Sequence, residues 1–84
     1  SPIKRIGRDR FLRNVLIAIG NSDDKSLVEN ALNNLQDNSP LVRGAAVWAI
    51  KKLLDDNEIK KIKAQHIINE KDNSVIAEWE NNIS

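Results

Sequence analysis

Few residues of this chain could perform chemistry on a bound substrate. The sequence has no cysteine and a single histidine, His66, which no second histidine or acidic cluster accompanies at metal-ligand spacing. No serine stands beside a candidate general base, and no glycine-rich phosphate loop is present. We therefore expect neither a catalytic residue nor a metal site, and we interpret His66 as an ordinary helix residue.

Positive charge at the start of the chain is the feature best suited to binding. Five of the thirteen Lys and Arg residues fall in "SPIKRIGRDRFLRN", residues 1–14, although the net charge of the chain is only +1. Arginine favours phosphate because its planar guanidinium group donates two parallel hydrogen bonds. The alternative is a basic end that only keeps the chain in solution. The candidate anion-binding residues are Lys4, Arg5, Arg8, Arg10, Arg13 and Asn14.

The hydrophobic spacing predicts an all-α fold with five helices and no strand. Residues 40–54 are apolar around most of the circumference, so this helix should lie between neighbours on both sides. Residues 1–8 show little periodicity, and we expect them to form a basic segment along the surface with Ile3 and Ile6 turned inward. The predicted helices are 9–20, 24–36, 40–54, 58–69 and 74–83.

Capping residues are assigned to several of these helices. Asp9 is the expected N-cap of the first helix, and Pro40 begins the third, where a missing N–H costs nothing. Ser74 is the expected N-cap of the last helix. The side chains of that helix that we expect to face inward are Ile76, Trp79 and Ile83.

The helices also repeat. "FLRNVLIAIGN" (11–21) aligns with "LVRGAAVWAIK" (41–51) at an offset of 30 residues. A period of this length with two helices per unit is typical of an α-solenoid. We therefore predict that residues 1–84 form one domain, a short HEAT-like α-solenoid of about five helices. The alternative is an irregular five-helix bundle.

Two arginines occupy the same place in this repeat. Asp37 and Arg43 have the spacing at which an aspartate and an arginine of a HEAT-like unit bond to each other, so we predict a structural Asp–Arg pair. Arg13, the repeat mate of Arg43, has Gly7 where the aspartate would stand. Arg13 is therefore the freer of the two to bind a ligand.

The boundaries of the chain carry their own expectations. The sequence lacks methionine and begins with Ser1-Pro2, so we expect a part of a longer protein. No apolar run approaches the ~20 residues of a membrane span, and no signal peptide is visible. Together with the absence of cysteine, this pattern is typical of a cytoplasmic protein without a membrane partner.

The stretch "SPIKRIGRDRFLRNVLIAIGNS" (1–22), followed by "DNSPLVRGAAVWAI" (37–50), resembles the C-terminal region of the epoxyqueuosine reductases. That family reduces epoxyqueuosine at the wobble position of tRNA. The resemblance implies a parent oxidoreductase with cobalamin and two [4Fe–4S] clusters, none of them held by this chain. It also implies a HEAT-like C-terminal domain whose basic residues, from Lys4 to Asn14, contact the backbone of the anticodon stem-loop.

On this interpretation the chain is a non-catalytic tRNA-binding accessory domain, and its partners are tRNA and the catalytic domains of the parent. The alternative is a HEAT-like scaffold that binds another protein or supports the catalytic core. In the supporting role, we expect Ile3, Ile6 and Phe11 to be partly exposed.

Overall fold

The computed structural model describes residues 2–81, and this part of the chain is helical and contains no strand. The predicted all-α class is therefore confirmed. Short 3-10 turns at Lys25–Leu27 and Ile67–Asn69 precede α2 and follow α4. The helices are α1 (Pro2–Asn21), α2 (Val28–Asn33), α3 (Pro40–Leu53), α4 (Asp56–His66) and α5 (Asn73–Glu80).

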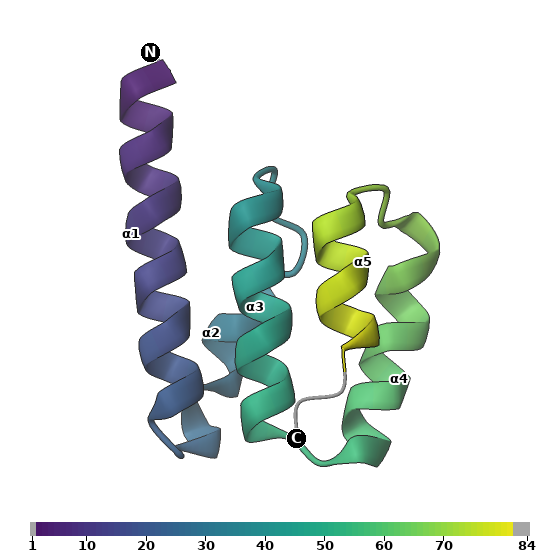
Figure 1. The fold of residues 1–84 in the computed structure, drawn as a ribbon. Helices are drawn as coiled ribbons and strands as arrows, with labels where there is room; N and C mark the ends of the chain where they lie inside the picture. Colours follow the sequence, from purple (N-terminus) through teal and green to yellow (C-terminus); the bar gives the residue numbers. More distant parts are fainter. Residues whose placement is uncertain (1, 82–84) are drawn as a thin grey trace.

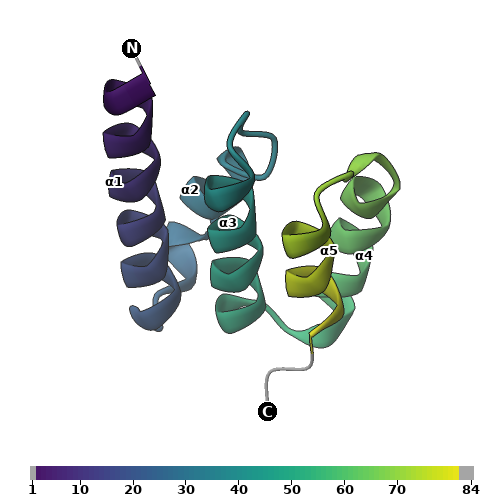
Figure 2. The same cartoon turned by 45° about the horizontal axis from the view of Figure 1, so that its top comes forward.

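The helices lie in two layers. α1, α3 and α5 stand side by side in one layer, while α2 and α4 lie behind them, as both views show (Figures 1 and 2). α3 contacts all four other helices, whereas α1 and α5 lie on opposite sides of it. This confirms that the helix predicted at 40–54 lies between neighbours on both sides.

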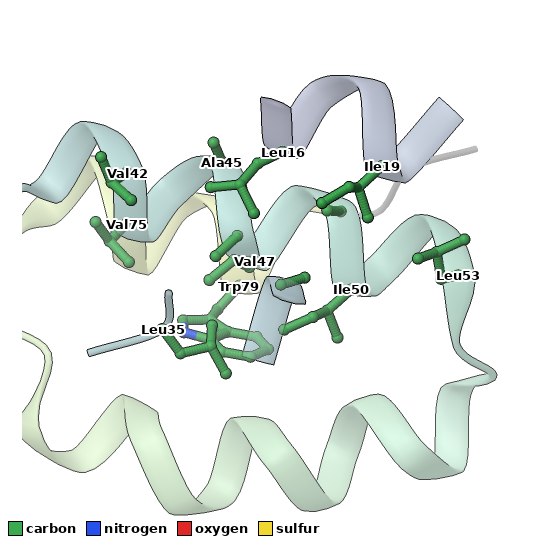
Figure 3. Close-up of a cluster of buried hydrophobic side chains, with 13 residues drawn as sticks. Leu16, Ile19, Leu35, Val42, Ala45, Val47, Ile50, Leu53, Val75 and Trp79 are labelled. Atoms are coloured by element: carbon green, nitrogen blue, oxygen red, sulfur yellow. The ribbon is translucent and has the colours of Figure 1, made fainter. Parts of the chain in front are cut away.

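The core is aliphatic and centres on α3 (Figure 3). Of the thirteen buried hydrophobic residues in the described chain, seven belong to α3. Leu16 and Ile19 of α1 pack on one side of α3, and Val75 and Trp79 of α5 pack on the other. Each fully buried Leu, Ile or Val side chain contributes about 1.5–3 kcal/mol, so α3 holds the fold together.

α1 begins at Pro2 and not at Asp9, so the expected irregular segment over residues 1–8 is wrong. Proline lacks a backbone N–H, which makes it compatible with a first helical turn. Lys and Arg favour the helix, and Gly7 is the only weak helix former before Asp9. Ile3 and Ile6 are 82% and 52% exposed, so the expectation that they turn inward is also wrong.

The first turns of the later helices depend on aspartate caps. Asp55 accepts from the backbone N–H of Glu58 while the Glu58 side chain accepts from the Asp55 N–H, and this capping box starts α4 two residues earlier than expected. The N-cap of α5 is Asp72 and not Ser74. α4 itself contains no buried residue; Ile59 and Ile62 are half-buried against the core.

α2 is shorter than the predicted helix 24–36. Asp24 caps only the 3-10 turn, and the chain leaves the helix after Asn33. The side-chain amide of Asn34 donates to the carbonyl of Asn30 at 2.8 Å, a bond that competes with continued helix. On α5, Val75 is buried where Ile76 was expected, Trp79 is buried as expected, and Ile83 lies outside the described residues.

Two contacts fix the outer helices against α3. A Cβ on Gly20 would lie 2.5 Å from the Trp48 ring, so only glycine lets the ring lie across α1. At the other side, the Lys51 ammonium donates to the carbonyls of Glu78 (2.6 Å) and Trp79 (3.3 Å), which are free at the end of α5. Burial lowers the pKa of Lys51.

Candidate polyanion-binding surface

The six candidate residues all lie on α1, where they divide into two sets. Successive residues turn by about 100° around a helix, so Lys4, Arg5 and Arg8 fall within an arc of about 100°. Arg10, Arg13 and Asn14 share another such arc. Arg8 and Arg10 point about 160° apart. We call these the first and second basic sets; the structure groups three and three, not a single row of six.

The first basic set faces a hollow beside the start of α3. Lys4, Arg5 and Arg8 line this space of about 650 Å³ together with Asp9 and residues 38–40. Ser39, the N-cap of α3, makes no side-chain capping bond, so the first backbone N–H groups of α3 have no side-chain acceptor there. The positive end of the α3 dipole therefore adds to the charge of the first basic set.

Arg8 is already paired within the molecule. Its guanidinium donates to the Asp37 carboxylate at 2.5 and 3.3 Å and to Asp9 at 2.9 Å. The hydrogen bond that Arg8 donates lowers the pKa of Asp37, and the bonds that Asp37 and Asp9 accept raise the pKa of Arg8. Two carboxylates therefore offset the charge of Arg8, which the sequence predicts to bind an anion.

The remaining cations on α1 are available to a ligand. Among the described residues, Lys4, Arg5, Arg10 and Arg13 form no ion pair. All four side chains are exposed. These four residues, rather than all five cations of the amino-terminal stretch, provide the charge that a polyanion would meet.

The second basic set borders a groove between α1, α3 and α5. Arg13 donates to Asn14 at 3.3 Å and lies at the edge of this groove, which has a volume of about 390 Å³. Trp48 and Leu41 contribute apolar walls, and Glu78 lies on the α5 side. The groove therefore joins one cation to an apolar floor and an opposing carboxylate.

Arg43 is held inside the structure. Its Nε and Nη2 donate to the two Glu70 carboxylate oxygens, both at 2.9 Å, and its Nη1 donates to the backbone carbonyls of Asp37 (2.8 Å) and Asn38 (3.1 Å). Asp37 and Arg43 are thus bonded, but through the Asp37 carbonyl. The Asp37 carboxylate forms its ion pair with Arg8, and Glu70 is the anionic partner of Arg43.

Burial and hydrogen bonding act against each other at Glu70. Burial alone would raise the pKa of this carboxyl, but the bonds from Arg43 and from the Asp72 N–H lower it overall. The bonds that Glu70 accepts raise the pKa of Arg43. The pair links the α2–α3 connection to the segment before α5, so its role is to join successive parts of the chain.

The remaining residues considered for chemistry are His66 and the two tryptophans. His66 is half-buried at the end of α4, and no group of three His, Cys, Asp or Glu within residues 2–81 is arranged to hold a metal ion. Trp79 is buried in the core, and the Lys52 ammonium lies 5.5 Å from the centre of the half-buried Trp48 ring.

Sequence reasoning missed several contributors to this region. Ser39 and Asn38 line the hollow because α3 starts there, and the Pro40 signal for that start was visible. Glu70 and the Arg8–Asp37 pair gave no local signal, since each partner lies 27 or 29 residues from the arginine that it binds.

None of the described helices is long and apolar enough to cross a bilayer.

Comparison with known proteins places this chain beside one enzyme class. No protein-family model matches it, and no solved structure matches it. The epoxyqueuosine reductase of Salmonella typhimurium is 35% identical over 65 residues, which cover 77% of this chain and 17% of that protein. That of Xanthomonas campestris pv. campestris is 41% identical over 51 residues, which cover 60% of this chain and 14% of that protein.

The epoxyqueuosine reductase of Escherichia coli is 34% identical over 55 residues, which cover 66% of this chain and 14% of that protein. The chain thus spans less than a fifth of the length of the curated relatives it matches. It is similar to one part of an epoxyqueuosine reductase.

Proposed function

We propose that this chain is the tRNA-holding helical part of an epoxyqueuosine reductase and so acts in queuosine biosynthesis. The observation that carries the proposal is the set of four exposed cations on α1 that form no ion pair within residues 2–81: Lys4, Arg5, Arg10 and Arg13. The similarity to three epoxyqueuosine reductases supports RNA as the polyanion.

We further propose that the helices form a short HEAT-like stack. The 30-residue offset between 11–21 and 41–51 supports this, because both segments form front-layer helices, α1 and α3. In such a stack each helical pair contacts its neighbours and the ends remain open. α1 is then an end helix, which accounts for its unpaired cations.

The proposed contacts with RNA are to its backbone. Lys4 and Arg5 would place phosphates at the hollow beside the start of α3, where the N–H groups of the first turn add donors. Arg10, Arg13 and Asn14 would meet a second stretch of backbone across α1. Contacts to phosphates position an RNA without reading its sequence, so this part of the enzyme would hold and orient the anticodon stem-loop.

Reduction itself belongs to other parts of the proposed enzyme. Iron–sulfur clusters are held by cysteine thiolates, and this chain has no cysteine. The cobalamin and the two [4Fe–4S] clusters would therefore be bound by the catalytic domains, which are the second proposed partner. Since such an enzyme acts on tRNA, the proposal includes a cytoplasmic location.

The proposal is tested by fluorescence anisotropy with a labelled tRNA anticodon stem-loop. Four phosphate contacts should give a slope of about −3 in log K against log salt, because each contributes 0.7–0.9. The variants Lys4→Glu/Arg5→Glu and Arg10→Glu/Arg13→Glu should each weaken binding at least about tenfold and reduce the slope by about 1.5.

The matched control is Lys60→Glu/Lys61→Glu, which makes the same change in charge at two exposed lysines of α4. It should leave most of the affinity in place, since α4 lies in the other layer. Equal affinity loss in the α1 and α4 variants, or no loss in either, would overturn the proposal.

A further inference from the structure

The outer face of α1 carries apolar side chains that nothing in the described chain covers. Ile3 is 82% exposed, Phe11 is 65% exposed and Val15 is 38% exposed. With Gly7, these residues recur at every fourth position, and Ala18 lies within the same arc of about 120°. We define the outer face of α1 by these five residues; it lies opposite the side that packs on α3.

This face differs from the other exposed apolar side chains of the molecule. Ile6, Leu41 and Ile68 are also exposed, but Ile6 lies on another side of α1, Leu41 lines the groove beside Trp48, and Ile68 belongs to the 3-10 turn after α4. Single exposed apolar residues are ordinary on protein surfaces, whereas an aligned row indicates a surface that another molecule covers. A Cβ added at Gly7 would meet nothing, so the middle of the row is open.

Charge selects the kind of partner. Arg10 borders the outer face of α1 on one side and Arg8 borders it on the other, and Lys4 and Asn14 lie within the same arc. A symmetric pair of copies joined through this face would bring these cations together along one seam, where like charges repel. A partner with an apolar centre and an acidic edge fits better than a second copy of the chain.

We propose that the outer face of α1 docks the portion of an epoxyqueuosine reductase that lies outside the matched stretch. This inference rests on the proposed function. It is supported by chain length, since the matched stretches are only 14–17% of the relatives, which must pack this part against much more polypeptide. It is also supported by position, since the first turns of α1 extend past the start of α3 (Figure 1).

Docking and RNA binding are compatible on this helix. The first basic set faces the hollow at the start of α3, and Arg13 of the second set lines the groove between α1, α3 and α5. The centre of the docked face lies between Arg10 and Arg8 on the far side of α1, and only Lys4 and Asn14 of the two sets lie within its arc. An RNA backbone held by either set would therefore run beside the joint between this part and the rest of the enzyme.

Hydroxyl-radical footprinting read by mass spectrometry tests the docking. Two proteins are compared: residues 1–84 alone, and the Escherichia coli enzyme with the whole region that corresponds to residues 1–84 replaced by them. We expect Ile3 and Phe11 to be oxidised at least fivefold more slowly in the chimera. Ile68 is the matched control, because it is also an isoleucine with 82% exposure, and its rate should change less than twofold.

Leu16, which is 1% exposed, reports on folding and should stay unreactive in both proteins. If the chimera does not fold, the same footprint on the intact Escherichia coli enzyme, at the positions aligned with Ile3 and Phe11, provides the answer. Equal reactivity of Ile3 and Phe11 in the two proteins overturns the proposal. Protection of Phe11 in isolated 1–84 that rises with its concentration also overturns it, in favour of self-association.

No RNA is present in this experiment. Protection of Phe11 together with failed stem-loop binding would leave docking standing and remove the RNA-holding function. Stem-loop binding without protection of Phe11 would support the RNA-holding function and remove the docking proposal.

Discussion

The two halves of α1 belong to one regular helix but have different surroundings. In the second half, Leu16 and Ile19 are 1% and 6% exposed, and Gly20 lies directly against the Trp48 ring. In the first half, Ile3 and Ile6 are mostly exposed and no atom approaches Gly7. The second half of α1 therefore stabilises the fold, while the first half is mostly exposed surface.

Among the substitutions that test this difference between the two halves of α1, that of Gly20 should change the free energy of unfolding most. Gly20→Ala places a methyl group 2.5 Å from the Trp48 ring and 3.1 Å from the backbone of α3, so the two helices must move apart. Overpacking of this kind costs about 1–3 kcal/mol, and we expect a value of about 2. Urea unfolding followed by tryptophan fluorescence measures the loss; unchanged stability would show that the two helices are not in close contact.

Removal of the Glu70 charge should have the next largest effect. Glu70→Gln leaves Arg43, whose side chain is 19% exposed, with a neutral partner, and should lower the free energy of unfolding by about 1.5 kcal/mol. Asp37→Asn, the matched change at the more exposed Arg8, should cost less. A larger loss for Asp37→Asn would mean that the first half of α1 is anchored as firmly as the second.

Acid should weaken both of these pairs. The pKa values of Asp37 and Glu70 are lowered in the folded state, so their stabilisation is present above their ordinary values and is lost as the pH falls through the lowered ones. The melting temperature should therefore decrease as the pH is lowered from about 6 to 3. The double variant Asp37→Asn/Glu70→Gln should show a smaller decrease; an equal decrease would assign the acid sensitivity to other carboxylates.

Substitution of Gly7 should have the smallest effect and the opposite sign from that of Gly20. Gly7→Ala meets no neighbouring atom and removes a weak helix former, so we expect stability to rise by about 0.5–1 kcal/mol. Thermal unfolding by circular dichroism measures the gain. A loss of stability would show that the first half of α1 is packed more closely than the structure indicates.

The sequence predicts the packed half of the molecule better than its exposed surface. α3 was placed almost to the residue, because Pro40 marks its start and half of its residues are buried. The first half of α1 was missed because hydrophobic periodicity reports burial, and a helix without a buried face produces no such pattern. On α5, Trp79 is buried as predicted, but its buried neighbour on the helix face is Val75 and not Ile76, the residue on the other side of Trp79.

The candidate site was predictable in composition but not in geometry. The residue types at Lys4, Arg5, Arg10 and Arg13 were visible in the sequence, while their division into two sets follows from the helix that carries them. The capture of Arg8 by Asp37 depends on a contact between residues far apart in the chain. No local pattern marks such a contact.

α4 has no buried side chain, although it is as regular as α3 in Figure 1. Local opening requires little free energy where few apolar contacts are lost. The amide protons of α4 should therefore exchange with deuterium early, through detachment of that helix alone, while those in the middle of α3 should exchange only when the whole chain unfolds.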